Sequence, residues 1–213
     1  MKTASGAGRA GAKPPHKPRK RPLQARAKFT VAAIFGAFVR IWKARGWAEV
    51  TTRAVALEAG ISVGALYEYF PGKQALLSGY LRHCIDALNE TIEREVIEAT
   101  GLHWRERVHK LVTLTLSMSN RELPYFDTEM LLLGYEVAEL KHHRRIYQEL
   151  NAAWLRAVAA CADLPRPAPP ELVRALFTAC WGGRRYLLLV DPRRVTGGQW
   201  VTEMEQLCCA MLA

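Results

Sequence analysis

Apolar residues recur at helical spacing along almost the whole chain, and no segment alternates with the two-residue period of a strand. The clearest stripe lies near the N-terminus and follows i, i+3, i+4, i+7 and i+8 positions: Ile34, Ala37, Phe38, Ile41 and Trp42. The pattern predicts an all-α fold.

Prolines and glycines divide the C-terminal two thirds of the chain into further helices. Pro124 ends one connection, the segment 163–170 contains four prolines, and Gly197-Gly198 forms another break. We therefore expect helices over about 73–99, 104–119, 127–140, 144–162, 171–189 and 199–212.

Between the first stripe and these helices lie two short helical patterns joined by a tight turn. Thr51 precedes the first and Ser62 precedes the second, where their hydroxyls can cap the helix. Gly60 suits the left-handed residue of the turn. The second helix is predicted over Val63–Tyr69, and Lys73 opens the next helix. This arrangement is typical of a helix-turn-helix, whose second helix enters the major groove of DNA.

The residues of this segment follow the pattern TTR-x-VA-x-x-AG-[IV]-S-x-G-x-LY-x-YF-x-x-K-x-x-L. The segment resembles the DNA-binding domain of the tetracycline-repressor (TetR) family, and the match covers about residues 26 to 80. The resemblance implies a three-helix DNA-binding head at 26–73 and a helical ligand-binding and dimerisation body at 74–213. Residues 1–25 then form a tail, which we predict to be disordered.

Carried over to this chain, the resemblance implies two sets of DNA contacts. Contacts to backbone phosphates fall on Thr52, Tyr67, Tyr69 and Lys73. Base-facing positions fall on Arg53, Ser62, Val63, Gly64 and Ala65.

Arg53 is the base-facing side chain suited to bidentate recognition of guanine. Alternatively, it is a solvated arginine that pairs with Glu49 or Glu58. Gly64 departs from the larger residues often found at its position in the family.

Positive charge is concentrated in the tail and the head. The net charge is +10; residues 1–25 hold seven basic and no acidic residues, and residues 26–73 hold seven basic and three acidic residues. The remainder holds sixteen basic and seventeen acidic residues. The distribution fits a polyanion such as double-stranded DNA as partner. The tail is either a solubilising extension or a basic arm that reaches the minor groove or flanking phosphates.

The last two predicted helices carry apolar stripes that are core residues by default, among them Leu176, Gly183, Tyr186, Met204 and Met211. In the resembling family the corresponding helices form a four-helix dimer interface. The resemblance thus implies a homodimer on a palindromic operator, with half-sites about 34 Å apart or a multiple of that distance.

The resemblance also implies a pocket for a small-molecule effector inside the body. The candidate lining residues are Met118, Phe126, Met130, Trp154 and Trp181. Arg184 and Arg185 interrupt an apolar helix. A buried arginine there would need an anionic partner; the alternative, which we favour, is a surface or inter-subunit salt bridge. His142-His143 fits a solvated helix end better than a metal site.

The sequence lacks the motifs that are typical of several function classes. The five cysteines show no CxxC spacing, and there is no P-loop, nucleophile elbow or HExxH, so we expect no enzyme, no metal and no cofactor. No apolar run approaches the roughly 18 residues of a membrane span, and no secretory signal is present, which favours a cytoplasmic protein without a membrane partner.

The sequence therefore predicts a sequence-specific DNA-binding transcriptional regulator, acting as a ligand-responsive dimeric repressor. Two alternatives remain open. One is a non-specific architectural DNA binder driven by the basic tail, and the other is a helical small-molecule-binding protein without DNA binding.

Overall fold

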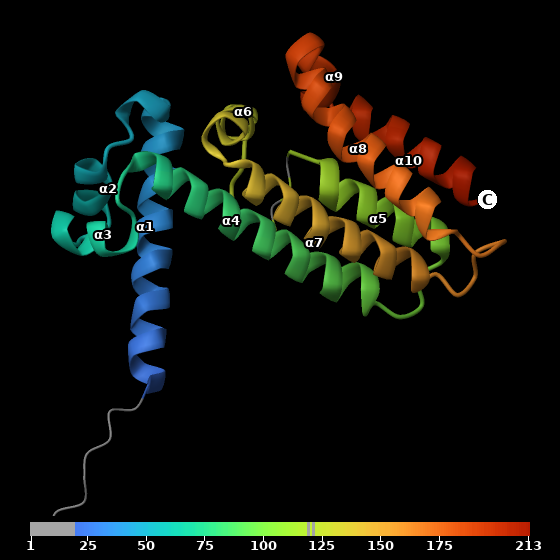
Figure 1. Ribbon diagram of the computed structural model, residues 1–213, viewed down its shortest axis with the longest axis horizontal. Coiled ribbons are helices and arrows are strands. Elements are labelled where there is room, and N and C mark those ends of the chain that lie inside the picture. The colour runs from blue at the N-terminus through green and yellow to red at the C-terminus, as the bar shows by residue number, and fades with distance from the viewer. Residues whose placement is uncertain (1–19, 119, 121) are drawn as a thin grey trace, which may run out of the picture.

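The computed structural model describes residues 20–118, 120 and 122–213, and their regular elements are all helices, which confirms the all-α fold. Figure 1 shows a head of three helices beside a bundle of the remaining ones. The head consists of α1 (Lys20–Glu49), α2 (Thr52–Glu58) and α3 (Val63–Tyr69). The body consists of α4 (Lys73–Ile92), the π-helical turn η1 (Glu93–Ile97), α5 (Trp104–Leu116), α6 (Thr128–Val137), α7 (Leu140–Ala159), α8 (Pro170–Val190), α9 (Pro192–Thr196) and α10 (Gln199–Leu212).

The N-terminal boundary of the head lies earlier than the residue 26 that the sequence suggested. Helix α1 begins at Lys20, so the last residues of the predicted tail are helical. Residues 1–19, which hold the rest of that tail, lie outside the described residues.

The head is built around the predicted apolar stripe of α1, all five residues of which are buried. They share one cluster with Val55 and Ala56 of α2 and Leu66 of α3. The cluster extends beyond the head into α4 and α6, through Leu76, Leu77, Tyr80 and Met130. The head and the start of the body therefore have a common core.

The two short helices begin and end as their capping residues predict. Thr51 Oγ1 accepts a hydrogen bond from the Ala54 amide at 3.0 Å, and Ser62 Oγ accepts one from the Ala65 amide at 3.1 Å. Gly60 lies between them with φ of 70°, in the left-handed region that favours glycine.

The body is organised around α5, which packs against α4, α7, α8 and α10 (Figure 1). Trp154 of α7 and Phe177 of α8 are fully enclosed in its core, where their rings lie 5.5 Å apart. The Trp154 indole N–H donates to Thr115 Oγ1 of α5 at 3.0 Å. This bond satisfies the polar end of a buried aromatic residue.

Several helix ends differ from the prediction, and one helix was not predicted. Helix α6 ends at Val137 because Ala138 adopts an extended conformation, with ψ of 131°, and α7 then begins at Leu140 rather than 144. Helix α9 was not predicted, because the Asp191-Pro192 break suggested only a loop. Pro192 occupies the first turn of α9, where its missing N–H costs nothing.

The turn between α2 and α3 yields a matched pair of substitutions. We expect Gly60→Ala to lower the free energy of unfolding by about 1 kcal/mol, because an L side chain is strained at this φ. Gly64→Ala should leave it within about 0.5 kcal/mol or raise it, because Gly64 is helical and its Cβ would meet only Ser62 Oγ, at 3.9 Å. Urea unfolding at matched protein concentrations measures both; equal losses would contradict the assignment of strain to Gly60.

Candidate functional site

Helix α3 presents one face to the core and the other to solvent. Leu66 is buried, whereas Val63, Gly64, Tyr67 and Tyr69 are exposed. Most of the predicted DNA contacts thus lie on the solvent-facing side of this short helix, the α3 face, which comprises Val63, Gly64, Tyr67 and Tyr69. Small residues at its start leave room for a close approach to another surface.

The predicted base-facing positions at the start of α3 differ in accessibility. Ser62, the N-cap, is exposed; its Oγ accepts the cap bond from the Ala65 amide and keeps its proton and a second lone pair for a ligand. Ala65 itself is half-buried. The accessible positions of this set are therefore Ser62, Val63 and Gly64.

The structure brings together two of the four predicted phosphate contacts. Thr52 Oγ1 and Tyr67 Oη lie 3.2 Å apart, so α2 and α3 present adjacent hydroxyls. Lys73 begins α4, where unpaired amides favour an anion. Its Nζ lies 3.4 Å from the Trp47 carbonyl oxygen and 4.2 Å from the Trp47 ring centroid, which holds the ammonium group against the head. Tyr69 is exposed at the last turn of α3.

Arg53 is exposed and makes no ion pair with any residue between 20 and 213 that the structure describes. Glu58, one of its two predicted partners, instead pairs with Arg40, whose Nε lies 2.5 Å from Glu58 Oε1. The alternative in which Arg53 pairs with Glu49 or Glu58 is therefore not realised. Its guanidinium group is free to meet a ligand.

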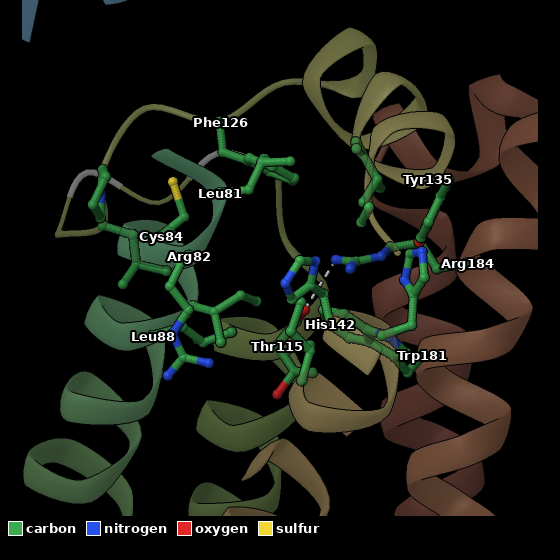
Figure 2. Close-up of a pocket in the computed structure, with 18 of the residues that line it drawn as sticks. Leu81, Arg82, Cys84, Leu88, Thr115, Phe126, Tyr135, His142, Trp181 and Arg184 are labelled. Atoms are coloured by element: carbon green, nitrogen blue, oxygen red, sulfur yellow. Dashed lines mark hydrogen bonds between the residues drawn. The ribbon is translucent and has the colours of Figure 1, made fainter. Parts of the chain in front are cut away.

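A cavity of about 920 Å³ lies in the body between α4, α5, α6, α7 and α8. The segment that joins α5 to α6 also borders it, through Met118 and Phe126. Together with Trp181, these are three of the five predicted lining residues. Figure 2 shows Phe126 and Trp181 among the side chains around the cavity.

The other two predicted lining residues do not reach the cavity. Met130 is fully buried in the core shared by head and body, because α6 turns it toward α1 and α4. Trp154 is enclosed in the body core and bound to Thr115. Helical spacing marked both as apolar, but it did not distinguish a core position from a cavity wall.

The cavity wall is unexpectedly basic. It includes four arginines and two histidines and, among the described residues, no Asp or Glu: Arg82, Arg145, Arg184, Arg185, His142 and His143. Sequence reasoning missed most of them because they come from α4, α7 and α8, which only the fold brings together. The histidines lie in the first turn of α7, so the expectation of a solvated end complementing the dipole is wrong: His142 is half-buried.

The charges of two of these arginines are paired with carboxylates that do not line the cavity. Arg82 Nη1 lies 2.6 Å from Glu149 Oε2, and Arg82 also pairs with Asp86. Arg145 Nε lies 2.8 Å from Glu149 Oε1. Although burial opposes it, the hydrogen bonds from Arg82 and Arg145 lower the pKa of the Glu149 carboxyl group.

Arg184 is different, because it is buried and has no carboxylate partner among the described residues. Only 3% of its surface is exposed. Its Nη1 donates to the Thr115 carbonyl at 3.0 Å, and its guanidinium lies 4.3 Å from the Trp181 ring centroid. Burial lowers the pKa of the Arg184 guanidinium. The salt bridge that we expected is therefore wrong for Arg184.

The segment before α6 joins the cavity wall to the head. Trp42 Nε1 of α1 donates to Asp127 Oδ2 at 2.7 Å, and Tyr80 Oη donates to the Tyr125 carbonyl at 2.6 Å. Tyr125 and Phe126 border the cavity. A change in the cavity thus has a direct route of contacts to α1.

In the described part of the chain, no helix is long and apolar enough to span a membrane. Nor does any group of three or more His, Cys, Asp or Glu residues there have the arrangement to hold a metal ion.

Comparison with known proteins locates the resemblance in the head. Residues 34–79 match the family described as bacterial regulatory proteins, tetR family. Nucleoid occlusion factor SlmA of Pasteurella multocida (strain Pm70) is 27% identical over 109 residues, which cover 49% of this chain and 50% of SlmA. The HTH-type transcriptional regulator BetI of Brucella suis biovar 1 (strain 1330) is 29% identical over 84 residues, which cover 39% of this chain and 41% of BetI. The chain thus spans about half the length, or less, of these curated relatives.

The fold of the whole chain has counterparts among solved structures. A TetR transcription regulator from Haloarcula marismortui ATCC 43049 superimposes with a TM-score of 0.58 at 20% identity, covering 87% of this chain and 97% of that one. At this identity the match establishes the shared fold of head and body.

The bond between Trp42 and Asp127 provides a test of the head–body junction. Trp42→Phe should lower the free energy of unfolding by about 1–2 kcal/mol, because it removes a hydrogen bond to a charged group in a largely buried setting. Since Asp127 also caps α6, the contribution of the pair itself is measured by a double-mutant cycle with Asp127→Asn. Additive losses in urea unfolding would show that the two side chains are not coupled.

Proposed function

We propose that this chain, whose residues 34–79 match the tetR family of bacterial regulatory proteins, is a cytoplasmic, dimeric transcriptional regulator that binds a palindromic operator and is released by a small-molecule effector. The observation that carries this proposal is the α3 face. An accessible recognition helix lies beside the Thr52–Tyr67 hydroxyl pair, in the most basic part of the described chain. That combination suits a DNA groove flanked by phosphates.

The names of the curated relatives point to different roles, nucleoid occlusion for SlmA and transcriptional regulation for BetI. Sequence similarity in the head does not distinguish between these two roles. The cavity of about 920 Å³ favours a ligand-responsive regulator, because its volume falls in the range of small-molecule sites.

In the proposed complex, phosphate contacts fix the register and Arg53 reads sequence. Tyr67, Tyr69 and Thr52 contact one stretch of backbone, and Lys73 contributes a charge at the start of α4. Arg53 is exposed and free of ion pairs within the described chain, as bidentate recognition of guanine requires.

The effector would act through the segment that precedes α6. An occupant of the cavity contacts Tyr125 and Phe126, and a shift of this segment moves Asp127, to which Trp42 of α1 is bound. An effector that favours the shifted arrangement lowers the population of heads spaced for the operator. The factor by which the effector can weaken DNA binding is limited by the ratio of its affinities for the two arrangements.

Dimerisation through α8 and α10 is supported by apolar side chains that these helices expose. Tyr186, Leu189 and Val190 of α8 and Leu207 and Met211 of α10 are exposed large apolar residues. The two helices run side by side along one flank of the body in Figure 1. An exposed apolar surface of this kind is typical of a protein–protein interface.

DNA binding is tested with duplexes selected by the protein from a random library, and with unselected duplexes as reference. Lys73→Ala and Tyr67→Phe should weaken binding to both pools alike, and Lys73→Ala should reduce the salt slope by about 1 because one phosphate contact is lost. Arg53→Ala should cost about 1–3 kcal/mol on the selected site and much less on random DNA. Fluorescence anisotropy over a salt series measures each effect.

Lys141→Ala is the matched control, because Lys141 is an exposed lysine of the body paired with Glu139. It should bind like the wild type. Deletion of residues 1–19 distinguishes a sequence-specific regulator from an architectural binder that depends on the basic tail. The regulator keeps its sequence preference without these residues, whereas the architectural binder loses its DNA binding. Failure to enrich any sequence, or loss of all binding on deletion of the tail, would contradict the proposal.

The dimer interface is tested by charge substitution. Leu189 is 69% exposed on α8, and Leu189→Glu should weaken dimerisation by at least about tenfold, because a desolvated carboxylate would face the partner. Leu57 on α2 is 82% exposed, and Leu57→Glu should leave the dimer intact. Analytical ultracentrifugation over a concentration series measures the dimer dissociation constant of both variants. An unchanged dissociation constant for Leu189→Glu would exclude this interface.

A further inference from the structure

The charge balance around the cavity leaves one buried cation uncompensated. Arg82 and Arg145 share the Glu149 carboxylate, and Arg82 also pairs with Asp86. Arg185 is exposed, and its guanidinium lies 4.1 Å from the Tyr135 ring centroid. Arg184, in contrast, is buried and has no carboxylate partner among the described residues. A buried cation without a counter-ion is costly unless something else supplies one.

Unsatisfied polar atoms converge near the same place. Tyr135 Oη of α6, His142 Nδ1 of α7 and Arg184 Nε of α8 are buried, and none of the three atoms makes a hydrogen bond of good geometry in the described structure. Burial raises the pKa of the Tyr135 hydroxyl, and the neighbouring Arg184 guanidinium opposes that rise, so these two groups lie beside each other. Figure 2 shows the Arg184 side chain extending from α8 toward His142 and Thr115. Buried polar groups are nearly always paired in folded proteins. Of the five buried side-chain atoms without a partner among the described residues, three line this cavity, which favours a ligand group there; the other two belong to Arg107 and Asn151.

Much of the wall formed by α4 and by the segment before α6 is apolar, as Figure 2 shows for Leu81, Leu88 and Phe126. Ile85 and Leu131 extend this surface on α4 and α6. Arg82 of α4 also borders the cavity, but its charge is paired with Asp86 and Glu149. The polar atoms occupy the end formed by α6, α7 and α8. The cavity therefore suits a molecule with an apolar body and a single polar end.

A purely structural role for Arg184 accounts for only part of these observations. Its Nη1 donates to the Thr115 carbonyl in the last turn of α5, where a cation complements the helix dipole. That bond satisfies one donor of the guanidinium. It explains neither the unpaired Nε nor the unpaired atoms on Tyr135 and His142.

We propose that the cavity binds an amphipathic organic anion, whose carboxylate pairs with Arg184 and whose apolar body lies against α4 and α6. The inference rests on the proposed function in taking this cavity as the effector site. It specifies the chemical class of the effector. A carboxylate would accept hydrogen bonds from Arg184 Nε and from Tyr135 and His142 at once.

The test uses probes that share an apolar chain and differ in the charge of one end: decanoate, decanol and decyltrimethylammonium, with naphthoate as an aromatic anion. Isothermal titration calorimetry on the full-length protein without DNA measures their affinities. We expect decanoate to bind about tenfold to a hundredfold more tightly than decanol, because the charge-assisted bonds form only with the carboxylate. The cationic probe should bind most weakly.

Arg184→Gln should remove the preference of decanoate over decanol and leave decanol binding largely unchanged. Arg184→Lys keeps the charge and should retain part of the preference. Arg174→Gln is the control, because Arg174 is an exposed arginine of the same helix that pairs with Glu171. If Arg184→Gln does not fold, as judged by circular dichroism, the test is the preference for decanoate over decanol in Arg184→Lys. A preference smaller than that of the wild type supports the inference, and an equal one contradicts it.

Three outcomes would overturn the inference. One is equal affinity for decanoate and decanol, another is a preference that survives Arg184→Gln, and the third is no binding of either anion. Because no DNA is present, failure here is separate from failure of the regulator proposal. That proposal stands or falls on the enrichment of an operator sequence.

Discussion

The carboxylate of Asp127 connects the head, α6 and the segment that borders the cavity. Its Oδ1 accepts the Met130 amide at 2.8 Å and so caps α6. Its Oδ2 accepts the Trp42 indole N–H at 2.7 Å and the Tyr125 hydroxyl at 2.9 Å. One residue therefore fixes the start of a body helix, the orientation of α1 and the segment that borders the cavity.

Further contacts near this residue join the cavity wall to the head. Met130, which follows the Asp127 cap, lies in the core that α1, α2 and α3 share with α4. Tyr80 of α4 donates to the Tyr125 carbonyl and closes the junction from the other side. A rearrangement of the cavity wall that leaves the head unaffected would have to break one of these contacts.

Local chemistry made the head predictable. Caps at Thr51 and Ser62, the left-handed Gly60 and the apolar stripe of α1 each depend on residues a few positions apart, and all appear as expected. The body helices were also recognisable from their period, but the break at Ala138 was not, because no proline or glycine marks it.

The cavity could not be derived in the same way. Its basic wall combines residues of α4, α7 and α8. Arg145 and Glu149 are one turn apart on α7, but only the packing brings Arg82 to Glu149 and leaves Arg184 buried without a carboxylate partner among the described residues. The sequence drew attention to Arg184, as a charge inside an apolar helix, but it suggested the wrong partner. Met130 and Trp154 show the converse, because apolar periodicity alone does not tell a core residue from a residue that faces a ligand.

The shared core also limits how far this protein can be treated as modular. Leu76, Leu77 and Tyr80 belong to α4 in the chain but to the head in their packing. A fragment that ends at Lys73 would lose these side chains and expose the apolar residues of α1 that they cover. Exchanging DNA specificity with a related regulator would therefore require transplanting the first two turns of α4 with the head, and an α6 whose inner face fits them.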